Sequence, residues 1–114
     1  MGDRISIQYK NKDAESIVLF SHWDGMALKK LADQHYKNIV LPLHEKDGSF
    51  TPLSRMEVDT VIIDFIRYLS VTRNDPSKPF EANYYLASNE NNGDNSDNGH
   101  WVLNVEAGEW THTW

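Results

Sequence analysis

The chain contains no cysteine, so disulfide bonds, cysteine-based zinc sites and thiol chemistry are all excluded. Its apolar runs are far shorter than a membrane span, and the first residues lack the apolar segment of a secretory signal. The sequence also carries no phosphate-binding glycine loop and no serine-hydrolase elbow. We therefore expect a soluble, cytoplasmic protein that has no membrane partner and no recognisable catalytic motif.

Basic residues are missing from the last third of the chain. All 11 lysines and arginines lie within residues 1–80, whereas residues 81–114 contain six acidic residues and neither basic type. The formal net charge of −6 therefore resides entirely in the last third. This segment cannot neutralise phosphates, so we do not expect a nucleic acid partner. It favours a cation or a basic protein surface, although an acidic surface that only keeps the protein soluble is the simpler interpretation.

The strongest periodic pattern in the chain lies between Ser54 and Leu69. Apolar residues recur there at the spacing of one continuous helix face, which predicts a buried helix at the centre of the core. Ser54 and Glu57 form a capping-box pattern that predicts the start of this helix. The residues of the predicted buried face are Val58, Val61, Ile62, Phe65, Ile66 and Leu69.

A second helix is predicted earlier in the chain. Its apolar stripe includes Leu28 and His35, Asp24 is a suitable N-cap, and Pro42 should stop the helix soon after residue 38. The residues that follow, 41–53, would then form a long connection.

Five apolar or alternating runs predict strands around these two helices. The predicted fold is therefore a single α+β domain of 114 residues with the order β-β-α-α-β-β-β. Its expected architecture is a mainly antiparallel sheet of four or five strands with two helices packed on one face. The predicted strands cover residues 5–9, 17–20, 84–87, 101–105 and 110–114.

The most polar stretch of the chain, residues 88–100, is the first candidate site. From Asp94 to Gly99 it matches the first half of a calcium-binding loop, but Val105 stands where a bidentate glutamate belongs. This pattern predicts weak binding of a divalent cation such as calcium, by a loop that is not an EF-hand. The alternative is a flexible loop, since asparagine, aspartate and glycine also suit tight turns. The expected ligands are Asp94, Asp97 and Asn98.

The second candidate site combines distant residues. His22 and His100 each lie beside a tryptophan at the end of a predicted strand. If those strands are neighbours, the two histidines and Asp24 could form a metal site of two histidines and one carboxylate. The alternative gives each residue a separate role, with Asp24 capping the first helix. In that interpretation Asn should replace Asp24 without harm, and Trp23 covers the junction between helix and sheet.

Aromatic residues in the last third provide a third signal. They predict a binding surface for a protein, a sugar or a flat ligand, or a contact with a second copy of the chain through the edge of the last strand. We predict a non-enzymatic binding or interaction module that uses this surface and the 88–100 loop, with a protein partner or a homo-oligomer. The alternative is a small metal-dependent hydrolase that uses His22, Asp24 and His100. The residues of the predicted surface are Tyr84, Tyr85, Trp101, Trp110 and Trp114.

Overall fold

Five strands form one sheet with β1 at its centre. The computed structural model describes residues 2–48, 50–73, 77 and 83–113, and the sheet within them has the order β3-β2-β1-β4-β5. β1 pairs with β4 in parallel, and the other neighbouring strands are antiparallel. The predicted α+β class and the order of elements are confirmed. The strands are β1 (Ile5–Lys10), β2 (Val18–Ser21), β3 (Tyr84–Ala87), β4 (His100–Asn104) and β5 (Glu109–Thr113).

The central strand β1 is buried on both faces. Ile5, Ile7 and Tyr9 belong to the hydrophobic core and are fully buried. Ser6 and Gln8 alternate with them on the opposite face, where Ser6 is 0% exposed and Gln8 is 8% exposed. Polar side chains that are buried in the middle of a sheet need hydrogen-bond partners there.

The first helical segment is longer than the sequence predicts. α1 (Met26–His35) continues through a π-helical turn, η1 (Tyr36–Val40), into α2 (Leu41–Asp47). The prediction that Pro42 ends this helix is wrong, because Pro42 lies in the first turn of α2, directly after the π-helical turn. A π turn changes the hydrogen-bond pattern locally, so the missing N–H of proline and its bulky ring do less harm there. The segment ends at Gly48, whose φ is 55°.

The predicted core helix forms, but it begins later than expected. α3 (Val58–Arg73) buries five residues of the predicted face, and Ile66, the sixth, is partly buried. The capping box is wrong: Glu57 immediately precedes the helix, and its carbonyl accepts from the N–H groups at positions 60 and 61. Ser54 instead closes a local turn, in which its Oγ accepts a 2.8 Å hydrogen bond from the N–H of Thr51. The five buried residues are Val58, Val61, Ile62, Phe65 and Leu69.

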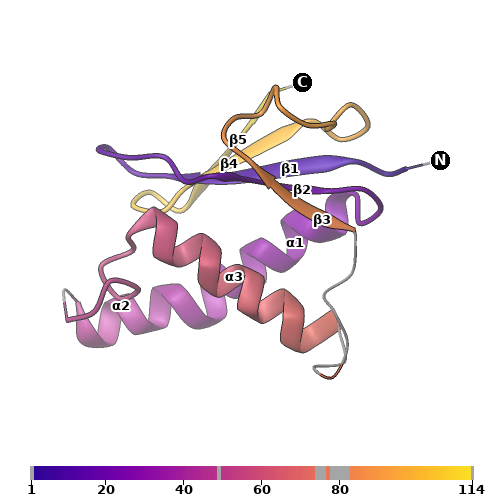
Figure 1. Ribbon diagram of the computed structural model, residues 1–114. Coiled ribbons are helices and arrows are strands. Elements are labelled where there is room, and N and C mark those ends of the chain that lie inside the picture. Colours follow the sequence, from indigo (N-terminus) through magenta and orange to yellow (C-terminus); the bar gives the residue numbers. More distant parts are fainter. Residues whose placement is uncertain (1, 49, 74–76, 78–82, 114) are drawn as a thin grey trace.

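The helices and the sheet share one hydrophobic cluster. Ile7 of β1 and Leu103 of β4 belong to it, together with Leu28 of α1 and Phe65 of α3. Figure 1 shows α1, α2 and α3 below the sheet. Among the described residues, no helix combines the length and the apolar character that a membrane crossing requires.

The segment between β3 and β4, residues 88–99, lies on the side of the sheet away from the helices (Figure 1); we call it the strap. Its Gly93 lies against the ring of Phe20, so closely that a Cβ there would be 2.7 Å from the nearest ring atom. Asn95 of the strap donates a 2.9 Å hydrogen bond to the Oγ of Ser6. The strap therefore packs on the sheet, and the interpretation as a loop that is merely flexible does not describe it.

Candidate functional site

A chain of hydrogen bonds runs across the sheet beneath the strap. The Nε2 of Gln8 donates to the carbonyl of Ser16 at 2.7 Å, so the Oε1 of Gln8 faces the Nε2 of His100 at 3.1 Å. His100 must therefore carry its proton on Nε2, and its Nδ1 accepts from the hydroxyl of Ser6 at 2.8 Å. Ser6 accepts from Asn95 in turn. Burial lowers the pKa of His100, although Glu90 opposes this effect. The neutral histidine thus connects the strap to the central strand.

Ser6 and His100 are hydrogen-bonded like a catalytic nucleophile and its base, but a substrate has no access to them. Ser6 is 0% exposed, and its hydroxyl both donates to His100 and accepts from Asn95. A catalytic serine must meet its substrate within hydrogen-bond reach of the base. The strap covers this pair, so its evident role is to hold the strap on the sheet.

The three residues of the predicted metal site do not come together. His100 lies in the hydrogen-bond chain under the strap, whereas the ring of His22 packs beside Tyr85 and Trp23 at centroid distances of 5.0 Å and 5.6 Å. Asp24 accepts hydrogen bonds from other residues. In the part of the chain that the structure describes, no three histidine, aspartate or glutamate side chains are arranged to hold a metal ion. The hydrolase hypothesis therefore lacks the geometry on which it depends.

Asp24 also does not cap α1. The N-cap is Gly25, with a φ of 56° and no side-chain cap hydrogen bond. Glycine suits this position because its φ lies in a region that other residues rarely adopt, and a Cβ would also force the carboxylate of Asp3, 2.1 Å away, to move. The Asp24 carboxylate accepts from the amide of Asn83 at 3.0 Å and from the hydroxyl of Tyr84. The capping prediction is wrong because these partners lie about sixty positions away and are invisible to local pattern reasoning.

Asn83 organises the turn that follows β2. Its Oδ1 accepts from the hydroxyl of Ser21 at 3.1 Å and from the backbone N–H groups of His22 and Trp23, both at 2.9 Å. Its Nδ2 donates to Asp24. Asn83 is buried, so this one amide fixes the backbone N–H groups of two consecutive residues and the hydroxyl of Ser21. Sequence reasoning missed Asn83, since a single asparagine before a strand gives no local signal of such a role.

Trp23 is presented to solvent by this turn. The sequence predicts that it covers the junction of helix and sheet, but its side chain is 59% exposed. It ends a row of rings in which Phe20 stacks on Tyr85 at 4.9 Å and His22 lies between Tyr85 and Trp23. The inner end of the row is fully buried at Phe20, so Trp23 extends outward from a rigid base.

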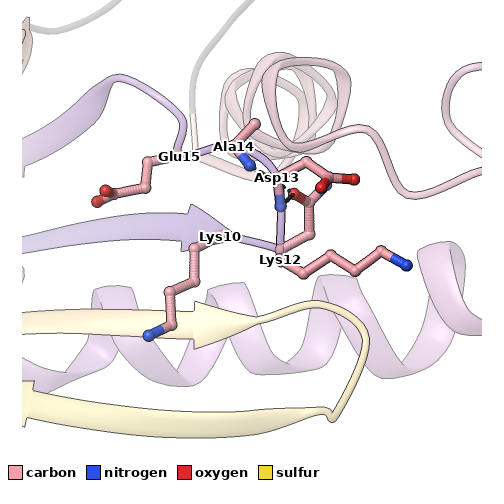
Figure 2. Close-up of a pocket in the computed structure, with 6 residues that line it drawn as sticks. Lys10, Lys12, Asp13, Ala14 and Glu15 are labelled. Atoms are coloured by element: carbon pink, nitrogen blue, oxygen red, sulfur yellow. Dashed lines mark hydrogen bonds between the residues drawn. The ribbon is translucent and has the colours of Figure 1, made fainter.

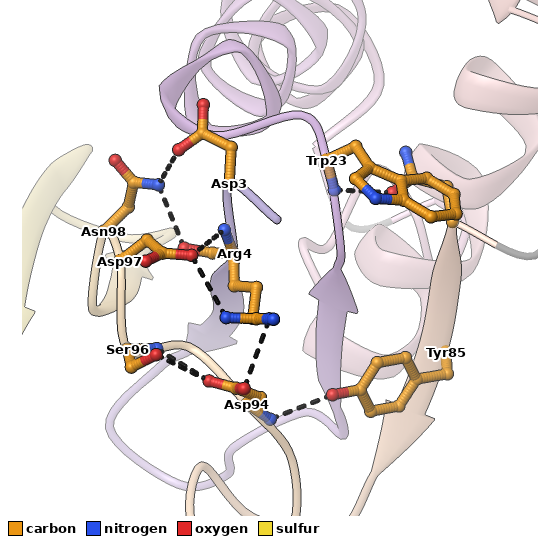
Figure 3. Close-up of polar contacts among 9 residues, drawn as sticks. Asp3, Arg4, Trp23, Tyr85, Asp94, Ser96, Asp97 and Asn98 are labelled. Atoms are coloured by element: carbon orange, nitrogen blue, oxygen red, sulfur yellow. Dashed lines mark hydrogen bonds and ion pairs between the residues drawn. The ribbon is translucent and has the colours of Figure 1, made fainter. Parts of the chain in front are cut away.

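Arg4 holds the acidic part of the strap against the N-terminal segment (Figure 3). Its Nε lies 3.2 Å from Asp94 and its Nη1 lies 3.5 Å from Asp97, and Asn98 donates to Asp3 at 2.6 Å. Hydrogen bonds from the backbone and side chain of Ser96 lower the pKa of Asp94. A calcium ion bound by the predicted ligands would have to displace the guanidinium group. Calcium binding by this loop stays a prediction.

The acidic strap meets the aromatic row at Tyr85. The backbone N–H of Asp94 donates to the hydroxyl of Tyr85 at 2.9 Å (Figure 3). The exposed tryptophan therefore lies on the same side of the molecule as three carboxylates: those of Asp94 and Asp97, which pair with the guanidinium of Arg4, and that of Asp3, which accepts from Asn98. This combination is the candidate site, and we call it the Trp23 surface: Trp23, Tyr85, Asp3, Asp94 and Asp97.

The aromatic residues predicted to share one surface fall into separate groups. Tyr84 and Tyr85 lie on β3 at one edge of the sheet, and Trp101 and Trp110 lie on β4 and β5 at the other edge. β1 and β2 lie between these strands, so the structure does not bring Tyr84 and Tyr85 together with Trp101 and Trp110. Trp114 lies outside the described residues.

A buried histidine in the core has a different role. His35 is 0% exposed, and its Nε2 lies 2.7 Å from Asp64, which also accepts a 2.8 Å bond from Arg67. Burial lowers the pKa of His35, and the hydrogen bond to Asp64 offsets part of that shift. This contact joins α1 to α3 inside the core and offers nothing to a ligand.

The turn between β1 and β2 borders an open hollow of about 290 Å³ (Figure 2). The turn is closed by Asn11, whose Oδ1 accepts from the N–H groups of Asp13 and Ala14. Oppositely charged side chains border the hollow without converging on one point, so it provides no candidate site (Figure 2). Its lining residues are Lys10, Asn11, Lys12, Asp13, Ala14 and Glu15.

In comparisons with known proteins, the chain matches no family model, no curated protein and no solved structure.

Proposed function

We propose that this protein is a non-enzymatic binding module that recognises a basic segment of a partner protein through the Trp23 surface. The observation that carries the proposal is the 59% exposure of Trp23 at the end of a row of packed rings. Tryptophan is strongly enriched among the residues that dominate binding energy at protein interfaces. An exposed indole on a rigid base is therefore a suitable anchor for a partner.

The rigidity of the turn supports this role. Asn83 accepts from the backbone N–H groups of both His22 and Trp23, so the backbone that carries the indole is already fixed before any partner binds. Binding then loses less conformational entropy than it would with a flexible loop.

Charge defines the class of partner. The carboxylates of Asp3, Asp94 and Asp97 outnumber the guanidinium of Arg4, and residues 81–114 contain no lysine or arginine. Carboxylates at the rim of an interface attract basic partners and repel acidic ones. Two copies of this chain would repel each other across this surface, so the proposal names a different protein as the partner.

The test uses two fluorescent peptides of equal length that share their apolar residues. One carries lysine and arginine at the remaining positions, and the other carries glutamate and aspartate. We expect fluorescence anisotropy to show binding of the basic peptide, weakened by salt, and little binding of the acidic one. Trp23→Ala should weaken binding by about tenfold or more.

Phe50 provides a matched control, because it is an aromatic residue that is 83% exposed in the loop between α2 and α3. Phe50→Ala should bind the basic peptide as the wild type does. Equal binding by Trp23→Ala and the wild type, or equal binding of the two peptides, would contradict the proposal.

A further inference from the structure

Two tryptophans at the other edge of the sheet enclose the ammonium group of Lys29. Trp101 of β4 and Trp110 of β5 are diagonal neighbours on the same side of the sheet, as the pairing of Trp101 with His112 and of Leu103 with Trp110 requires. The Nζ of Lys29, which α1 carries, lies 5.4 Å from the centroid of Trp101 and 5.3 Å from that of Trp110. Both distances fall within the range of cation–π attraction, so the two indoles share one cation.

Contacts that do not involve Lys29 hold both rings in place. The indole N–H of Trp110 donates to Asp33 at 3.1 Å, and that of Trp101 donates to the carbonyl of Asn98 at 2.9 Å. The ring of Trp101 also stacks on His112, with centroids 4.1 Å apart and planes within 11°. The rings should therefore keep their positions when Lys29 moves away or is shortened.

Asp33 adds a negative charge beside the two rings. Burial alone would raise the pKa of this carboxyl group, but hydrogen bonds from Lys37 and Trp110 lower it overall, so the group is ionised at neutral pH. Lys37 lies 2.9 Å from the other carboxylate oxygen. Both indoles are only partly buried, so this group of side chains opens to solvent.

We propose that Trp101, Trp110 and Asp33 form a binding site for an alkylated ammonium group, and that Lys29 is its internal occupant. The inference is independent of the Trp23 surface. Aromatic rings with a nearby carboxylate favour quaternary ammonium groups, whose diffuse charge is weakly hydrated. Lysine is more strongly hydrated and is carried on a flexible stem, so it is a replaceable occupant. The ligand would be a trimethylated lysine of a partner or a free compound of the choline type, which share this chemistry.

The test compares choline with 3,3-dimethylbutan-1-ol, which has the same shape without the charge. Binding is followed through the indole N–H signals in NMR spectra, which separate Trp101 and Trp110 from the other tryptophans. Lys29→Ala should bind choline about tenfold more tightly than the wild type, because the internal competitor is gone. Lys30→Ala removes an exposed lysine next in sequence on α1 and should behave as the wild type.

Further variants separate charge from shape and from folding. Asp33→Asn in the Lys29→Ala background keeps an acceptor for Trp110 but should weaken choline binding and leave the neutral alcohol unaffected. Trp110→Phe preserves an aromatic ring for folding and should also weaken binding. Peptides with trimethylated or unmodified lysine then show whether the ammonium group belongs to a partner protein or to a free compound. Preference for the trimethylated peptide supports a protein ligand. Choline binding no tighter in Lys29→Ala than in the wild type, or equal binding of the neutral alcohol, would overturn the proposal.

Discussion

Gly93 lies directly against the ring of Phe20, and replacing it with alanine tests whether the strap is part of the folded core. A Cβ at this position would lie 2.7 Å and 2.8 Å from ring carbons, whereas carbon atoms in contact are normally 3.5–4.0 Å apart. The ring has little room to retreat, because Phe20 is 0% exposed and its ring stacks on that of Tyr85. The strap must therefore move away from the sheet to accommodate one methyl group.

The magnitude follows from two opposing effects. Overpacking of this kind costs about 1–3 kcal/mol. Alanine also restricts the unfolded chain, which stabilises by about 0.4–1 kcal/mol where the backbone allows it, and Gly93 does not have the positive φ that would exclude alanine. We expect Gly93→Ala to lower the free energy of unfolding by about 1–2 kcal/mol, as measured by urea denaturation at equilibrium. Asn92→Ala, an exposed neighbour in the strap, should change it by less than about 0.5 kcal/mol.

A second substitution tests the cause of this loss. Phe20→Leu removes the ring atoms that the new methyl group meets, so the double variant should be more stable than the sum of the single effects implies. A Gly93→Ala variant as stable as the wild type would refute the packing of the strap on Phe20. If the two single effects on the free energy of unfolding simply add in the double variant, the methyl group introduced by Gly93→Ala clashes with a residue other than Phe20.

The remaining predictions concern the core, the turn after β2 and pH. Phe65→Ala should lower the free energy of unfolding by about 3–5 kcal/mol because it leaves a cavity. Ile63→Ala, at a position 60% exposed on the same helix, should lower it by less than about 0.5 kcal/mol. A loss below about 1 kcal/mol for Phe65→Ala would mean that the buried face is misassigned. Asp24→Asn should cost about 1–3 kcal/mol, nearly as much as Asp24→Ala, since both remove the carboxylate that accepts two side-chain donors; a harmless Asn would restore the capping role. Burial lowers the pKa of His35 and of His100. Below pH of about 6.5 these histidines therefore take up protons more readily in the unfolded chain than in the folded protein. The free energy of unfolding should fall as the pH decreases from that value. Denaturation curves at pH 7.5 and pH 5.5 that coincide would contradict this expectation.

Local patterns predicted the elements that depend on local physics. The apolar spacing identifies the buried face of α3 because a helix repeats every 3.6 residues whatever it packs against. Alternation indicated β1, β4 and β5 for the same reason, and short apolar runs indicated β2 and β3. His35 was placed correctly in the buried stripe of the first helix. The start of α3 was missed because Ser54, a good capping residue, closes a turn with Thr51 instead.

The candidate site depends on contacts between distant residues, so sequence patterns could not predict it. Asp24 meets the amide of Asn83, and Asp97 meets Arg4, across most of the chain. The strap has the composition of a flexible loop, and only the close approach of Gly93 to Phe20 reveals that it is packed. The exposure of Trp23 likewise follows from the geometry that Asn83 imposes on the turn.

The parallel pairing of β1 with β4 determines the order in which the protein can be completed during synthesis. β1 and β2 can pair as soon as they leave the ribosome, but the second edge of β1 waits for residues 100–104. Ser6 and His100, which meet in that pairing, are 94 positions apart, and such distant contacts slow folding. Until then an apolar strand from the middle of the future sheet has an unpaired edge, which is the kind of edge that joins other chains. Fragments that end before β4 should therefore aggregate, whereas shortening β5, an outer strand, should be tolerated better.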